Sequence, residues 1–193
     1  MTTSTSRRTH LLAAAALATS MTIAACSSTS APSTSNATSA TGGTSAQVLP
    51  VADNPITNTS TSPGLAIASV IVENNTDPAT AKATDDHLEI ALTNTASATL
   101  TDFEIFYSFT DPTTATTENY YLAVPPTFTI DPGATRIAHF DNTRTTDHFP
   151  VNSYSLYTTS PNALDVALTV STKGAAVQTA TAHKDAGGPE QAD

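Results

Sequence analysis

Three stretches of the sequence alternate between apolar and polar residues, and this period of two constrains the fold more than any other feature. Successive side chains of a β-strand point to opposite faces, so each stretch is predicted to be a strand with one buried face. The stretches are "HLEIALTN", "DFEIFYSFTD" and "ALDVALTVS". Their apolar series are Leu88, Ile90 and Leu92; Phe103, Ile105, Tyr107 and Phe109; and Leu164, Val166, Leu168 and Val170.

Further strands are predicted at 65–73, 118–124, 126–130, 135–141, 153–159 and 175–183. Turn-forming residues separate these segments, as in Asp131-Pro132-Gly133 and Lys173-Gly174. No amphipathic helix interrupts the series. Eight or nine short strands at regular spacing predict one all-β domain, an antiparallel β-sandwich. The chain has one cysteine and no tryptophan, so an antibody-type core is not expected.

The N-terminus has the layout of a secretory signal. Arg7 and Arg8 precede the uncharged apolar stretch 11–25, which is too short to span a bilayer securely. The residues Ile23-Ala24-Ala25-Cys26 resemble a bacterial lipobox. The resemblance implies a diacylglyceryl thioether on Cys26, cleavage before Cys26, and anchoring by acyl chains such as palmitate. The alternative is an ordinary signal peptide in which Cys26 has no role.

The export route stays open between two alternatives. The segment Ser6 to Leu12 is similar to a twin-arginine signal, but His10 stands where an aromatic residue is usual. We therefore favour the general secretory route. The predicted layout is a helical lipoprotein signal peptide at 1–25, a lipidated cysteine and disordered Ser/Thr/Ala-rich tether at 26–50, a β-sandwich at 51–184 and a flexible tail at 185–193.

The charge balance limits the class of partner. The formal net charge is −10, and the predicted signal carries Arg7 and Arg8 but no acidic residue, so its removal makes the chain more acidic still. Nucleic acid requires a positive surface, and a polybasic contact with anionic lipids requires the same. We expect no nucleic-acid partner. Contact with the membrane is expected through the lipid on Cys26.

Two segments resemble a known domain type. "LEIALTNTASATLTDFEIFYSFTD" followed by "TFTIDPGATRIAHFD" is similar to the immunoglobulin-like domains of bacterial envelope lipoproteins, of the FxLYD type. The similarity covers about 55 residues and consists mostly of core and turn positions. The matching residues are Asn94, Thr95, Phe106, Tyr107, Asp111, Pro132 and Gly133. The resemblance implies an immunoglobulin-like sandwich and specifies the fold better than the function.

The best metal candidate is weak. His139 and Asp141 alternate on one predicted strand face, and His148 lies in the next loop. Imidazole and carboxylate ligands suit zinc or a similar cation. The favoured alternative is a half-exposed strand face that carries these side chains without a ligand. No catalytic motif occurs in the sequence, and no cofactor is expected.

The segment "ENYYLAVPP" is the candidate recognition surface. Tyr120 and Tyr121 point to opposite faces of a predicted strand, so one of them should be outside. The favoured alternative places one tyrosine in the core and leaves the prolines only to turn the chain. The sequence as a whole suggests an extracytoplasmic, lipid-anchored, non-catalytic binding or structural module for a protein or envelope component. The alternatives are a small-ligand or metal-binding lipoprotein associated with a transporter and, less favoured, an enzyme.

Overall fold

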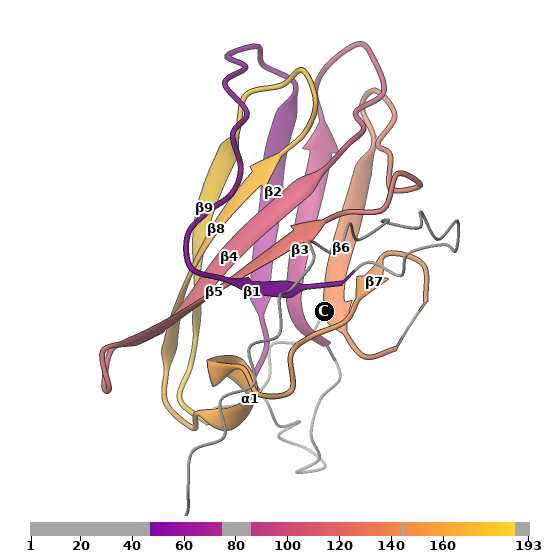
Figure 1. Ribbon diagram of the computed structural model, residues 1–193. Helices are drawn as coiled ribbons and strands as arrows, with labels where there is room; N and C mark the ends of the chain where they lie inside the picture. The colour runs from indigo at the N-terminus through magenta and orange to yellow at the C-terminus, as the bar shows by residue number, and fades with distance from the viewer. Residues whose placement is uncertain (1–46, 75–85, 144, 188–193) are drawn as a thin grey trace, which may run out of the picture. The chain divides into compact units, whose positions relative to one another are not determined.

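In the computed structural model, which describes residues 47–74, 86–143 and 145–187, the chain forms two β-sheets that pack face to face (Figure 1). One sheet has the strand order β1-β5-β4-β8-β9 and the other β2-β3-β6-β7. The elements are β1 Leu49–Val51, β2 Leu65–Val72, β3 Asp86–Asn94, β4 Glu104–Asp111, β5 Thr116–Ala123, β6 Thr135–Asp141, β7 His148–Phe149, α1 Leu156–Thr159, β8 Leu164–Ser171 and β9 Gln178–Lys184.

The predicted all-β sandwich is confirmed. The chain forms β2 and β3 in one sheet, crosses to β4 and β5 in the other, returns for β6 and crosses again to β8 and β9. Such an exchange between the two sheets is a Greek-key type of connection, which is common in β-sandwiches. All strand pairs are antiparallel except β6 with β7. β1 lies across the predicted boundary at residue 51 between tether and domain.

The core consists of the apolar faces that the alternation predicted. Every member of the three series named above is buried between the sheets. An aromatic cluster lies within this core. Tyr107 lies at its centre, 5.4 Å from Tyr120, 5.4 Å from Phe109 and 5.2 Å from Phe140, measured between ring centroids. Burial raises the pKa of the Tyr107 hydroxyl far above its ordinary value.

Two predicted strands are wrong. Segment 126–130 forms a turn, because the Phe128 amide donates to the carbonyl of Pro125, and only Ile130 bridges to Leu100. Segment 153–159 contains the one-turn helix α1 instead of a strand. Its alternation puts Tyr157 in the core. The Ser155 carbonyl, however, accepts from the amides of Thr158 and Thr159, three and four residues ahead, which closes one helical turn. Local hydrogen bonds therefore replaced strand pairing.

Polar contacts fix the end of the sandwich that holds α1. Asp111 Oδ2 accepts from Asn162 Nδ2 at 2.8 Å and from Ser160 Oγ at 3.1 Å. These bonds, with the Asn162 contact as the largest cause, lower the pKa of Asp111 to about 2. Lys184 is buried beside them, its Nζ 5.5 Å from the ring centroid of Tyr157, and burial lowers its pKa. Both charged groups therefore belong to the structural framework of this end.

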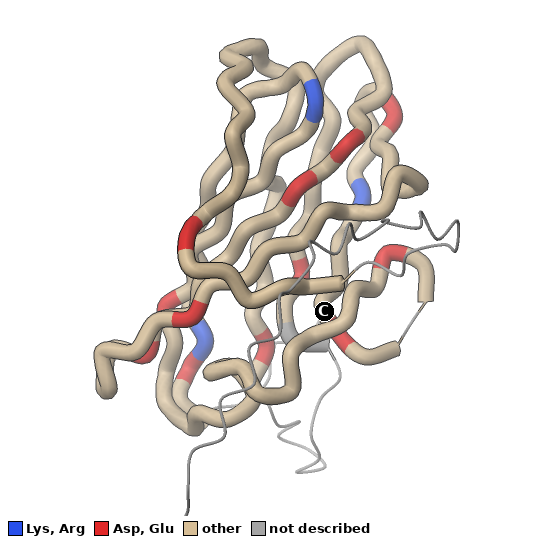
Figure 2. The backbone as a smooth tube through the Cα atoms, in the orientation of Figure 1, with Lys and Arg blue, Asp and Glu red and all other residues tan. Residues whose placement is uncertain are grey.

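The charge distribution agrees with the acidic composition. Figure 2 shows acidic positions spread over the domain and isolated basic positions among them. None of the described helices is long and apolar enough to cross a membrane.

Candidate functional site

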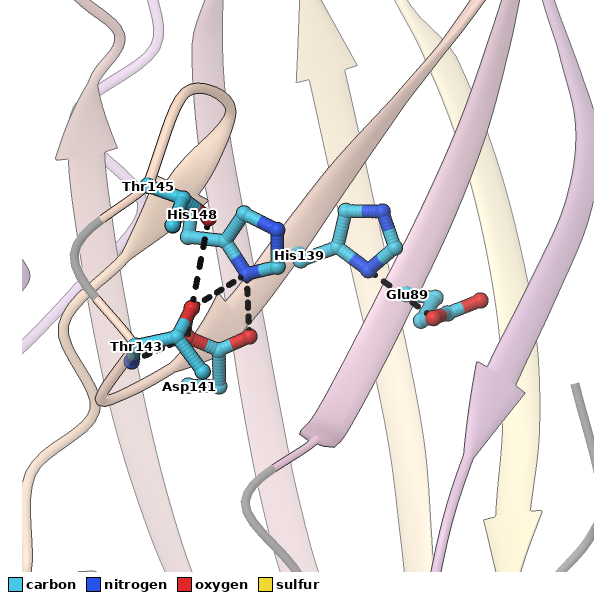
Figure 3. A network of polar contacts seen from close by, with 6 residues as sticks. All are labelled: Glu89, His139, Asp141, Thr143, Thr145 and His148. Carbon is cyan, nitrogen blue, oxygen red and sulfur yellow. Dashed lines mark hydrogen bonds and ion pairs between the residues drawn. The ribbon is translucent and has the colours of Figure 1, made fainter.

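Two histidines on neighbouring strands have stacked rings (Figure 3). His139 on β6 pairs with His148 on β7, and their ring centroids are 4.5 Å apart with the planes inclined by 9°. On the other side of β6, Glu89 on β3 is the antiparallel partner of His139. Directly opposed side chains point to the same face of a sheet. The strand register therefore places Glu89, His139 and His148 in one row.

Each imidazole has a carboxylate at its Nδ1 atom. His139 Nδ1 lies 2.8 Å from Glu89 Oε1, an ion-pair contact in which the N–H direction is not aligned for a hydrogen bond. His148 Nδ1 contacts Asp141 Oδ2, and the Asp141 side chain is 0% exposed. Asp141 Oδ1 also accepts from the amide of Thr143 at 2.7 Å and from its hydroxyl at 2.8 Å. These bonds satisfy a buried carboxylate and hold the β6–β7 loop against β6.

The threonine hydroxyl in this cluster is not placed as a nucleophile. Thr143 Oγ1 lies 2.8 Å from His148 Nδ1, the nitrogen that Asp141 also contacts. In a nucleophile–base–acid triad, the hydroxyl and the carboxylate bind opposite nitrogens of the ring, so that one orients the base while the other gives up its proton. With both groups at one nitrogen, the arrangement is that of a hydrogen-bonded turn.

The structure brings together the residues named for a metal, but their geometry does not suit one ion. Imidazole binds a metal through a lone pair in the ring plane. The planes of His139 and His148 are nearly parallel, so these lone pairs run side by side and do not converge. Within residues 47–74, 86–143 and 145–187, no group of three or more His, Cys, Asp or Glu side chains could hold a metal ion.

An open cleft of about 860 Å³ lies beside the histidine cluster. It is bounded by the β5–β6 connection on one side and by the β6–β7 loop on the other. Phe128, Phe149 and two prolines supply apolar surface, whereas Asn142, Asp147 and His148 supply polar groups. The cleft therefore combines an apolar surface with hydrogen-bonding groups at one site.

Arg136 on β6 holds both walls of this cleft. Its Nε and Nη2 donate to the two carboxylate oxygens of Asp147, each at 2.6 Å. Its Nη1 donates to the carbonyls of Thr127 at 3.2 Å and Thr129 at 3.0 Å. The guanidinium carbon lies 4.5 Å from the ring centroid of Phe128. One side chain therefore connects the β5–β6 connection with the β6–β7 loop.

Sequence reasoning missed Arg136 and Glu89. The chain has 7 Lys and Arg in total, and Arg136 is one that lies inside a predicted strand. That rarity was the signal that could have identified it. The role of Glu89 depends on the β3–β6 register, which no local pattern reveals.

The two tyrosines named for recognition lie on opposite faces, as the alternation predicted. Tyr120 is 3% exposed and packs in the core, with its hydroxyl donating to Glu118 at 2.8 Å. Tyr121 lies on the outer face, half-buried, and donates to Glu104 at 2.6 Å. Burial, and then the Glu104 hydrogen bond and charge, raise the pKa of Tyr121 to about 12. Of the pair, Tyr121 is therefore the one that lies outside the core.

The predicted lipidation residue, Cys26, lies outside the described residues. No family model matches the chain, and no curated protein is similar to it.

Proposed function

We propose that the protein is a lipoprotein anchored through Cys26 on the extracytoplasmic face of the cell membrane. In this proposal the sandwich is a non-catalytic binding or structural module for a protein or another envelope component. The observation that supports a binding role is the cleft beside His148, with its apolar surface, its polar rim and walls joined by Arg136.

A second candidate function is the binding of a small molecule by a lipoprotein associated with a transporter. The observation that favours it is the size of the cleft. A volume of about 860 Å³ falls within the range of roughly 300–1,000 Å³ that is usual for small-molecule sites.

The anchor is tested by fractionation. Wild type should sediment with membranes and carry a lipid adduct, and Cys26→Ser should be released into the soluble fraction without that adduct. Cys26→Ser that stays on membranes as firmly as wild type contradicts lipid anchoring.

The binding role is tested by photocrosslinking in intact cells. A photoreactive amino acid placed at Thr146, on the exposed cleft rim, should give a discrete adduct. The same amino acid at Thr114, in the exposed β4–β5 turn, is the matched control. The adduct should disappear when Asn142→Trp fills the cleft. Equal adducts at both positions contradict a partner in the cleft, and a small molecule retained in native mass spectrometry favours the second candidate.

A further inference from the structure

The outer face of the five-stranded sheet carries nine residues in a regular array, of which five are Ser or Thr. Ladder registers place these residues in three rows across β4, β8 and β9. On β4 and β8 the residues that alternate with this array are buried, and on β9 Ala180 and Ala182 are partly buried against the core. The array therefore lies on the outer face of the sheet. The rows are Phe106, Thr169 and Thr179; Ser108, Ala167 and Thr181; and Thr110, Asp165 and His183.

A shallow trough runs along β8 within this array. Two depressions, of about 410 Å³ and about 500 Å³, lie next to each other, since Ala167 and Thr181 line both. Ala167, the smallest residue of the three rows, lies between Ser108 of β4 and Thr181 of β9 at the place where the two depressions meet. From Asp165 to Thr169 it extends about 13 Å at the rise of an extended strand, which is the length of a short oligosaccharide.

Three of the five hydroxyls in the rows are available to a ligand. The other two are engaged, because Ser108 Oγ donates to the Ala167 carbonyl at 3.5 Å and Thr110 Oγ1 lies 3.0 Å from Thr117 Oγ1. In the part of the chain that the structure describes, no hydrogen bond involves the hydroxyls of Thr169, Thr179 and Thr181. A hydroxyl both donates and accepts, so these groups match a ligand that does the same. At one end lies the half-buried ring of Phe106, and at the other His183 Nδ1 contacts Asp165 Oδ1 at 2.9 Å.

Charge selects among hydroxyl-rich ligands. No Lys or Arg occupies the three rows, and the chain carries a net charge of −10, so a polyanion would be repelled. A neutral sugar chain offers hydroxyls to the threonines and an apolar C–H face to an aromatic ring. We propose that the trough binds a neutral polysaccharide, with Phe106 against one sugar ring and the hydroxyl rows along the chain. The trough lies on the opposite sheet from the cleft, and this proposal does not depend on the cleft.

The test is affinity electrophoresis of the full-length protein in gels that contain dextran, laminarin or galactomannan, with anionic alginate in a fourth gel. At least one neutral polysaccharide should retard wild type. Phe106→Ala removes the aromatic surface, and Ala167→Arg fills the trough. Each should weaken binding by about tenfold or more. Ile137→Arg makes the same change of charge on the outer face of the other sheet, where Ile137 is 39% exposed, and should bind like wild type.

Thermal melting of each variant shows whether lost binding reflects lost folding, and Ala167→Arg tests the trough even if Phe106→Ala unfolds. Three results overturn the proposal: no retardation by any neutral polysaccharide, retardation that Ala167→Arg leaves unchanged, or retardation by alginate alone. Light scattering tests one further alternative, in which the face is an interface between two copies of this chain. If wild type is a dimer that Ala167→Arg dissociates, the face is an interface between copies of this chain and the proposal is wrong.

Discussion

Arg136 and Asp147 form a two-pronged ion pair that joins the middle of the four-stranded sheet to the loop ahead of β7. Asp147 makes this contact from a left-handed backbone conformation, with φ at 68°. Such a conformation is uncommon for a residue with a side chain and persists where surrounding contacts fix it. The ion pair is one such contact, and the amide of His139, which donates to the Asp147 carbonyl at 2.9 Å, is another.

Arg136→Lys is predicted to lower the free energy of unfolding by about 1 kcal/mol or more, because a lysine ammonium cannot make the paired bonds to Asp147 and reach the two carbonyls together. Urea denaturation of the purified protein measures the change. Lys173→Ala is the control, since its contact with Asp102 is 4.0 Å long and exposed. Equal losses in the two variants would mean that the Arg136 contacts contribute little.

Asp111 is predicted to make the protein acid-sensitive in a defined window. Its folded pKa of about 2 lies below the ordinary value of 3.8, so the folded state holds the carboxylate ionised. The resulting stabilisation is complete above the ordinary value and is lost as the pH falls from about 4 toward 2. Urea midpoints between pH 2 and 6 should fall less in Asp111→Asn than in wild type. Asp102→Asn, at an exposed position just ahead of β4, is the control. A wild-type acid response in Asp111→Asn contradicts the assignment.

Tyr120 and Tyr121 are predicted to differ in their effect on stability. Tyr120→Ser empties a buried position in the aromatic cluster and should lower the free energy of unfolding by about 3 kcal/mol or more. Tyr121→Ser removes a half-buried side chain from the outer face and should cost about 1 kcal/mol. Chemical denaturation of the two variants makes the comparison. A larger loss for Tyr121→Ser would reverse the assignment of inside and outside.

Zinc is predicted to leave the melting temperature unchanged at tens of micromolar concentration. A metal that binds the folded state alone raises the melting temperature, and the parallel rings of His139 and His148 do not present converging lone pairs. Differential scanning fluorimetry with and without zinc makes the measurement. A rise that disappears in a variant carrying both His139→Gln and His148→Gln would show that the rings rearrange to bind the ion.

Regular alternation made the main strands predictable. Phe103 to Phe109 and Leu164 to Val170 alternate over several residues, and burial of one face fixes both their secondary structure and their orientation. Short elements were not predictable in this way. β7 has two residues, and its pairing with β6 depends on a loop closed by Asp141, Thr143 and His148. Segment 153–159 alternates as a strand does, yet its backbone bonds close a helical turn.

Sequence by itself determined the all-β class and the inward faces of the long strands. It also determined that Tyr120 and Tyr121 lie on opposite faces. Each of these results follows from the period of two along a single strand. Tertiary structure alone decided which strands became neighbours. That choice set Glu89 beside His139, stacked His139 on His148, and brought Arg136 to Asp147. These contacts depend on the register between strands and on loop closure, which arise when the whole core packs and leave no local pattern in the chain.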